Sequence, residues 1–189
     1  MRVFIILLFS LVVASCVPTF QLKKTDQATT MWNSYSVTTS ENINELKSEN
    51  SVFWTQDGPI LERIEFWEPV SDGETLPLAY MSGNEAQADR FRADMTPEEV
   101  VELLRNGFSL MPLTPTFFGN LQPMPFGDKP GYLMDVDLSA KDGSDFKGNI
   151  LFTTHQDRLM VIYFTARETH YYETRRPYFD AVVQSITLG

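Results

Sequence analysis

The residue types that carry out most protein chemistry are scarce in this chain of 189 residues. Its two histidines, His155 and His170, have no second histidine two to four residues away, so neither predicts a local metal-binding face. The nucleophile motif Gly-x-Ser-x-Gly is also absent. A solvated turn for His155 and a packing or hydrogen-bonding role for His170 are the simplest interpretations. A site assembled from residues distant in the sequence stays open.

Two pairs of acidic side chains have the residue types that glycoside hydrolysis uses. Glu98 and Glu99 stand where a helix is expected to begin, and Asp135 and Asp137 fall on the wet face of an expected strand. Both pairs are therefore interpreted as structural or solubilising. The acidic turn at 142–145 is too short for a calcium cage. We predict no catalytic residue, no metal ligand and no cofactor.

The most suggestive cluster lies in residues 166–178, where aromatic and cationic side chains interleave in an otherwise acidic chain. Tyrosine and arginine give large contact areas with polar tips and are enriched at binding hot spots. The segment is therefore a candidate recognition patch. Its members are Arg167, His170, Tyr171, Tyr172, Arg175 and Arg176. The structural alternative is that the tyrosine rings cover a sheet while the arginines neutralise Glu168 and Glu173.

The only cysteine of the chain, Cys16, follows an apolar run at the amino terminus. Arg2 supplies a positive flank, residues 3–13 form the apolar segment, and small residues lead up to Cys16, as in a secretory signal peptide. The run is shorter than the roughly 20 apolar residues that a membrane-spanning helix needs. We therefore expect residues 1–15 to be a signal peptide, either a plain cleaved one or that of a lipoprotein.

Residues 13–16, Val-Ala-Ser-Cys, resemble the lipobox of bacterial lipoproteins. The resemblance implies that the signal is cut before Cys16 and that this cysteine carries the lipid. Buried acyl chains contribute about 0.8 kcal/mol per methylene, so the three chains of such a modification would hold the protein permanently. Val17 follows the cysteine where an aspartate would favour the inner membrane, which implies the periplasmic face of the outer membrane in a Gram-negative cell.

Length and charge restrict the remaining chain further. Residues 32–189 suffice for one domain with a real core, and the polar residues 16–31 are expected to form a lipidated, flexible tether. With Cys16 assigned to lipid, no disulfide is available, so stability must come from packing. The net charge of −10 disfavours nucleic acid as a partner and disfavours electrostatic docking on anionic lipid.

The domain has the sequence pattern of an antiparallel sheet, because short runs of aromatic and β-branched residues alternate with turn pairs such as Asp142-Gly143. The last three expected strands should form a meander. Residues 159–164 have no polar face, which predicts a central strand covered on both sides. The expected strands are 35–39, 52–55, 60–67, 132–139, 146–154 and 158–165.

Two main helices are expected. Thr96, Pro97 and Glu99 form a capping box with proline at the first helical position, and Gly107 predicts the end of this helix. Apolar residues at three-and-four spacing predict a second helix that Pro177 opens and that runs to about residue 187. This order of elements predicts an α+β fold, a mostly antiparallel sheet packed with two main helices.

Several segments resemble uncharacterised proteobacterial lipoproteins, and the order of elements resembles the PsbP and Mog1-like sandwich. The segments are 32–33, 54–59 with Leu61, and 157–179. PsbP-like proteins are mostly extrinsic assembly or binding subunits and Mog1 binds a GTPase, so the resemblance implies binding without naming a partner.

These observations favour an outer-membrane-anchored periplasmic lipoprotein with a non-enzymatic binding or assembly role. Its expected partners are the membrane, through the lipid on Cys16, and an envelope protein or peptide. The alternative is a small-ligand-binding or hydrolytic domain with a pocket near His170.

Overall fold

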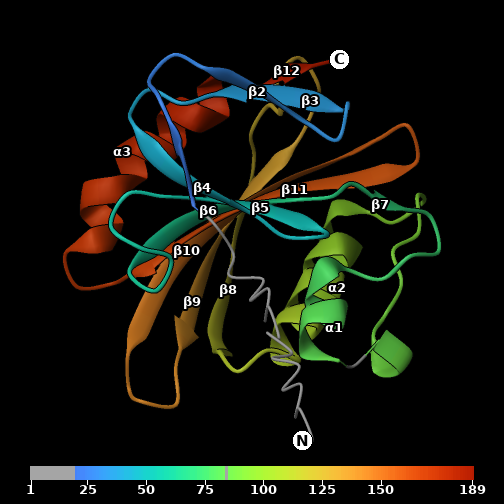
Figure 1. Cartoon of the computed structure of the whole chain (residues 1–189). Helices are drawn as coiled ribbons and strands as arrows, with labels where there is room; N and C mark the ends of the chain where they lie inside the picture. Colours follow the sequence, from blue (N-terminus) through green and yellow to red (C-terminus); the bar gives the residue numbers. More distant parts are fainter. Residues whose placement is uncertain (1–19, 84) are drawn as a thin grey trace, which may run out of the picture.

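The computed structural model describes residues 20–83 and 85–189, which form two antiparallel sheets and three α-helices (Figure 1). The expected α+β fold is confirmed. The helices are α1 (Pro77–Ser82), α2 (Pro97–Ser109) and α3 (Tyr171–Gln184), with a 3₁₀ turn η1 at Glu85–Gln87. The strands are β1 (Gln21–Lys23), β2 (Ala28–Met31), β3 (Tyr35–Thr38), β4 (Ile43–Lys47), β5 (Ser51–Thr55), β6 (Glu62–Trp67), β7 (Val70–Ser71), β8 (Thr114–Pro123), β9 (Tyr132–Ser139), β10 (Asp145–His155), β11 (Arg158–Arg167) and β12 (Thr187–Leu188).

The larger sheet has nine strands in the order β1-β4-β5-β6-β11-β10-β9-β8, and the short β7 also pairs with β11. All its pairings are antiparallel. The expected meander is confirmed as β9, β10 and β11, and β11 lies at the centre of the sheet as its apolar sequence predicts. The two-residue turn between β10 and β11 uses Gln156 and Asp157, both with positive φ, as a type I′ hairpin requires.

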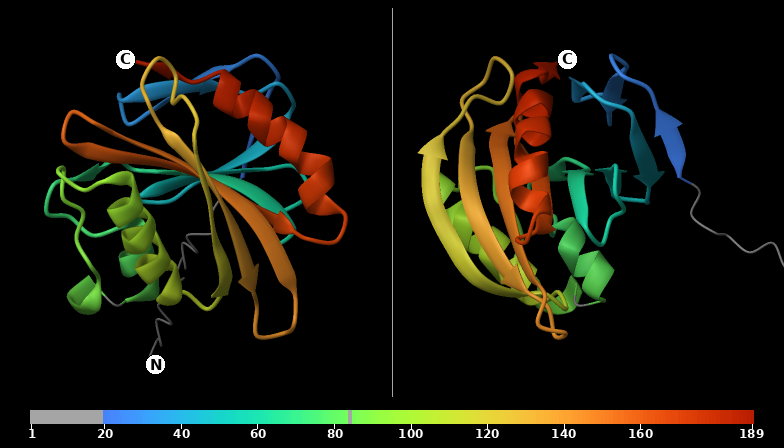
Figure 2. Two further views of the ribbon diagram at one scale, coloured as in Figure 1. Left: turned by 180° about the vertical axis from the view of Figure 1, so that it is seen from behind. Right: turned by 90° about the vertical axis from the view of Figure 1, so that its left-hand side faces the viewer.

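The core lies on both faces of the larger sheet because residues of β11 alternate between them. Ile162 and Phe164 pack with α3 and with the three-stranded sheet β12-β3-β2, whereas Val161 and Tyr163 pack with α1 and α2. Figure 2 shows this arrangement, with α3 between the strands of the larger sheet and the smaller sheet. The large aromatic surfaces of Trp54 and Trp67 predict burial, and both side chains are fully buried.

Helix α2 begins where its capping residues predict. Thr96 accepts a hydrogen bond from the Glu99 backbone, and the Glu99 carboxylate accepts one from the Thr96 backbone at 2.8 Å. The expected end at Gly107 is wrong, because the helix continues to Ser109. A Cβ at position 107 would lie 2.8 Å from Leu76 Cδ1, so this glycine allows close packing instead of ending the helix.

Helix α3 begins earlier than expected. It starts at Tyr171 after His170, whose φ is 76°, and Pro177 lies inside it instead of opening it. A proline inside a helix removes one backbone hydrogen bond, here the bond to the Glu173 carbonyl. Pro177 is exposed, so water can solvate that carbonyl. At the other end, Ser185 Oγ accepts from the Thr38 backbone N–H at 2.8 Å and ties the helix to β3.

The expected tether is partly wrong. Residues 20–31 belong to the folded domain, because β1 pairs with β4, and β2 pairs with β3 while burying Thr29 and Met31. Both are short strands at sheet edges with most of their residues exposed, which explains their linker-like composition. The expected signal peptide 1–15, and Cys16 with it, lies outside the described residues. Within residues 20–83 and 85–189, no helix is long and apolar enough to cross a membrane.

Candidate binding groove

The structure places the predicted recognition patch at the end of β11 and along α3, where Arg175 and Arg176 are held by other residues of the chain. Arg175 donates from Nε and Nη2 to Asp57 Oδ2, at 2.9 and 2.5 Å, and its Nη1 lies 3.7 Å from Glu41. Glu168 pairs instead with Lys147 at 2.8 Å. The expectation that the patch arginines neutralise Glu168 and Glu173 is therefore wrong.

Arg176 belongs to a polar network beneath α3. Its Nε donates to Asp180 at 2.9 Å, and its Nη1 donates to the Asn149 side-chain oxygen at 2.9 Å. The Tyr172 hydroxyl donates to the same oxygen at 3.0 Å, and Asn149, which is fully buried, donates onward to Asp135 at 2.7 Å. These bonds fix Arg176 and Tyr172 to the sheet.

The aromatic members of the patch pack against the core. Tyr172 stacks on Phe164 with ring centroids 5.8 Å apart, and Tyr171 is half-buried beside the same cluster. His170 is exposed, and its ring centroid lies 5.2 Å from that of Tyr171 in an edge-to-face arrangement. The tyrosine rings thus cover the sheet, as the structural alternative expects. The recognition role of the patch stays a prediction.

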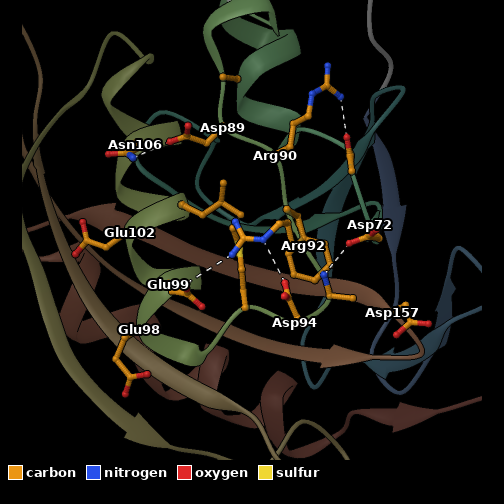
Figure 3. A pocket seen from close by; sticks show the side chains of 16 residues that line it. Asp72, Asp89, Arg90, Arg92, Asp94, Glu98, Glu99, Glu102, Asn106 and Asp157 are labelled. Carbon is orange, nitrogen blue, oxygen red and sulfur yellow. Dashed lines mark hydrogen bonds and ion pairs between the residues drawn. The ribbon is translucent and has the colours of Figure 1, made fainter.

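The structure has a concave feature away from this patch, beside α2. This acidic groove has a volume of about 1280 Å³, and Figure 3 shows the side chains around it. Seven carboxylates and two guanidinium groups line it. They belong to Asp72, Asp89, Asp94, Glu98, Glu99, Glu102 and Asp157, and to Arg90 and Arg92.

Four segments of the fold build the acidic groove, the first of which is the turn after β7 with Asp72 and Gly73. The exposed side of α2 supplies Glu98 and Glu102, the chain before α2 supplies residues 88–95, and the β10–β11 turn supplies Asp157. Beneath them Phe91 is fully buried and Leu103 nearly so, and both belong to the core cluster under α2. The groove walls therefore rest on a packed apolar base.

Both arginines of the acidic groove are engaged within the chain. Arg92 lies across the groove, with Nε 3.2 Å from Asp94 Oδ1 and Nη2 3.6 Å from Glu99 Oε1 (Figure 3). Arg90 donates to the Gly73 carbonyl at 2.7 Å. Since Arg92 is 55% exposed, its ion pairs are screened by water and can be exchanged for others at small cost.

Some carboxylates of the acidic groove remain without an internal partner. Asp89 accepts from Asn106 at 2.8 Å, Asp72 accepts from the Ala93 backbone at 2.8 Å, and Glu102 pairs with Arg105 at 3.2 Å. Glu98 and Asp157 make no side-chain hydrogen bond or ion pair with any residue the structure describes. Their carboxylates are free to bind a cationic ligand.

The acidic groove is suited to binding rather than to metal chemistry. Among the residues in the described ranges, no group of three or more His, Cys, Asp or Glu side chains converges closely enough to hold a metal ion. The carboxylates are spread along the walls, which suits several separate positive charges better than one ion. His170 does not line the groove.

Sequence reasoning missed this groove. It interpreted Glu98 and Glu99 as residues of a helix start, and for Glu99 the capping box confirms that role. The signal available in the sequence was the concentration of acidic residues between 85 and 102. Those that fall within the expected helix lie on its polar, exposed face. Asp157 joins them only through the pairing of β11 with β7, in which Arg158 lies opposite Ser71 and so brings the turn next to Asp72.

Comparisons with known proteins support the fold. No protein-family model matches this chain, and no curated protein sequence matches it. Among solved structures, it is similar to the solution structure of cyanobacterial PsbP (CyanoP) from Synechocystis sp. PCC 6803, with a TM-score of 0.53 and 11% identity. The match covers 93% of this chain and 96% of that one. At this identity the likeness concerns the fold alone, and the chain has a PsbP-like fold.

Proposed function

We propose that this chain is a lipid-anchored domain at the periplasmic face of the outer membrane, and that its acidic groove binds a cationic segment of an envelope protein or peptide. The observation that carries the binding role is the groove itself, in which Glu98 and Asp157 have no partner among the described residues. The Val-Ala-Ser-Cys sequence at 13–16 supports the anchor.

The charge balance of the acidic groove determines the class of ligand. Seven carboxylates against two arginines give a strongly negative field, which attracts lysine and arginine side chains and repels phosphates. Arg92 already shows how the groove accommodates a guanidinium, between Asp94 and Glu99. A ligand with several positive charges would bind Glu98 and Asp157 and would compete with Arg92 for the other carboxylates.

Fluorescence anisotropy with a labelled peptide of alternating lysine and glycine tests this proposal. The triple variant Glu98→Gln, Glu102→Gln, Asp157→Asn removes three negative charges from the groove walls without changing side-chain size. Because exposed ion pairs contribute about 0.2–1 kcal/mol each, we expect the loss of three to raise the dissociation constant by about threefold to a hundredfold. The wild-type affinity should also fall as salt is added.

A second triple variant, Asp26→Asn, Glu49→Gln, Glu173→Gln, provides the control. These three carboxylates are exposed and lie outside the groove, and replacing them removes the same total charge from the protein. Peptide affinity should stay close to that of the wild type. An equal loss in both triple variants would mean that only the net charge attracts the peptide, and the groove would not be the binding site.

A further inference from the structure

A smaller cavity of about 260 Å³ lies at the far end of the sheet face that α2 covers. We call it the Arg167 pocket. Its polar lining includes Arg63 of β6 and Thr165 and Arg167 of β11, and its apolar lining includes Ile60, Leu113 and Phe146. It shares no lining residue with the acidic groove.

Strand register brings the polar lining together. Thr165 lies directly opposite Arg63, and Arg167 follows two residues later on the same face of β11. Phe146 pairs with Arg167 from the neighbouring strand β10. Two guanidinium groups and one hydroxyl therefore converge from adjacent strands, which hold them more rigidly than loops would.

The polar atoms at the base of the Arg167 pocket lack hydrogen-bond partners. Thr165 is 3% exposed, and its Oγ1 makes no hydrogen bond of normal geometry with any described residue. The Nε atoms of Arg63 and Arg167 are likewise buried and without a hydrogen bond. Arg63 Nε is ion-paired with Glu65, and Thr165 interacts with the Tyr163 hydroxyl. Arg167 Nε has no such partner among the described residues, and because buried polar groups are rarely left unpaired, it is the atom here that calls for a ligand.

The two arginines differ in how far their charge is compensated. Arg63 Nε lies 3.4 Å from Glu65 Oε2, and its Nη1 donates to the Pro59 carbonyl at 3.1 Å. Arg167 has no ion pair or side-chain hydrogen bond with any described residue, and its guanidinium lies 5.6 Å from the centre of the Phe146 ring. Asp142 is the acidic group nearest to it in the lining. Hydrogen bonds from Ser144 lower the pKa of Asp142, and Arg167 adds to that effect from a distance.

A neighbouring hydroxyl adds a donor on the same face. Burial raises the pKa of Tyr163 to about 12, although Arg63 and Thr165 oppose the shift, so the hydroxyl stays protonated at neutral pH. Like Thr165 Oγ1, it lacks a hydrogen bond of normal geometry. Tyr163 does not line the pocket, so its hydroxyl acts on a ligand only through Thr165.

We infer that the Arg167 pocket binds a carboxylate that carries a small apolar group, either a free acid or the C-terminal residue of a peptide. The Arg167 guanidinium pairs with the carboxylate, and Thr165 Oγ1 donates a further hydrogen bond to it. The apolar group lies against Leu113, Phe146 and Ile60, whose side chain is 72% exposed in the ligand-free protein. An anion without an apolar group would leave that surface uncovered.

Saturation-transfer NMR on the full chain, with N-acetylleucine as the probe and N-acetylleucinamide as its uncharged counterpart, tests this inference. We expect the acid to bind and the amide to bind at least about tenfold more weakly, because the amide loses the charge-assisted hydrogen bonds. Equal binding of acid and amide would overturn the inference. So would displacement of the acid by an equal concentration of inorganic phosphate.

Two variants locate the site. Arg167→Gln should weaken N-acetylleucine binding at least about tenfold, whereas the control Arg105→Gln, which removes an arginine of α2, should not change it. Thr165→Val should weaken binding several-fold, because it replaces the hydroxyl that donates to the carboxylate by a methyl group of similar size. Unchanged affinity in a folded Thr165→Val protein would contradict the inference even if Arg167→Gln did not fold.

A leucine-terminated tripeptide separates the two sources of the carboxylate. Tighter binding of N-acetyl-Ala-Ala-Leu than of N-acetylleucine would assign the pocket to the C-terminus of a peptide, and weaker binding would assign it to a free acid. Both results require the carboxylate and support the inference. Binding of the tripeptide that survives amidation of its C-terminus would contradict it.

Discussion

Three glutamates of the larger sheet are almost completely buried, and each carboxylate accepts hydrogen bonds from specific donors. Glu45 accepts from the Trp54 indole at 3.0 Å, and Glu65 accepts from the Trp67 indole at 3.0 Å. Glu62 accepts from the Thr55 hydroxyl at 2.6 Å and from the Asp57 backbone at 2.9 Å, and so shapes the loop after β5. Such carboxylates are tolerated inside the protein because hydrogen bonds and, for Glu45 and Glu65, ion pairs with lysine or arginine compensate them.

Glu65 leads to a prediction on pH dependence. Burial raises the pKa of Glu65 above the ordinary carboxyl value of 4.5, although Arg63 and Trp67 oppose the shift. The folded state therefore binds this proton more tightly than the unfolded state, and the free energy of unfolding falls as pH rises above that value. The variant Glu65→Gln does not titrate there. Its stability relative to the wild type should rise from acidic to neutral pH in urea unfolding experiments.

The exposed residue Glu68, just beyond the same strand, gives a matched substitution. Glu68→Gln controls for the removal of one negative charge from this region. A stability difference between Glu65→Gln and the wild type that stays constant over the same pH range would contradict the assignment of the raised pKa to Glu65.

At the residue scale the sequence predicts burial better than it predicts partners. The burial of Trp54 and Trp67 follows from their aromatic surface and is confirmed. The partner of Arg175 is Asp57, which is 118 residues away, and only the assembled sheet and α3 bring the two together. Sequence spacing carries information about contacts within a helix or a hairpin and none about such a pair.

At the scale of elements, β10 depends on a glycine at its centre. A Cβ on Gly148 would clash with the Phe164 backbone oxygen and would approach Val136 Cγ1 to 3.1 Å. Because neither the backbone nor the packed valine can move freely, Gly148→Ala should lower the free energy of unfolding by about 1–3 kcal/mol in denaturant titrations.

Gly119 on the edge strand β8 is the matched control for that substitution. A Cβ there would meet only the ring of Phe117, which is 40% exposed and can rotate away. Gly119→Ala should therefore change the stability far less than Gly148→Ala. Equal losses for the two variants would show that the close contact at Gly148 is not what limits this strand.

Elements with strong local signals were predictable, and elements defined by tertiary pairing were not. The capping box located the start of α2, and apolar alternation located β9, β10 and β11. Strand β8 escaped prediction because its exposed, irregular pairing leaves no alternating pattern. The first turns of α3 are not predicted, because their residues are mostly polar and show no apolar residues at three-and-four spacing. The sequence therefore predicts the start of this helix at Pro177, six residues too late.

At the scale of the whole molecule, the proposed lipid anchor and the folded domain are separate features. The described fold begins with β1, an edge strand of the larger sheet, directly after the segment that contains Cys16. Its core on both sheet faces consists of residues from 31 onward. Because this core is built from residues well beyond Cys16 in the sequence, we expect the domain to fold with or without the lipid.

This separation predicts the effect of removing the lipid attachment. A Cys16→Ser variant should lose incorporation of labelled fatty acid and should leave the membrane fraction, because no other feature of this acidic chain favours anionic lipid. Its circular dichroism spectrum and melting temperature should match those of the lipidated protein. Retention of the variant in the membrane fraction would contradict the proposed anchor.

The central claim is that the acidic groove, and not the patch along α3, is the surface that recognises a cationic partner. Amide chemical-shift mapping by NMR during titration with the lysine–glycine peptide tests it most directly. We predict that the largest shifts fall on residues 88–106 and on Asp157. Shifts centred on residues 167–176 would contradict this proposal, and so would shifts no larger than those that an uncharged control peptide of alternating glycine and serine produces.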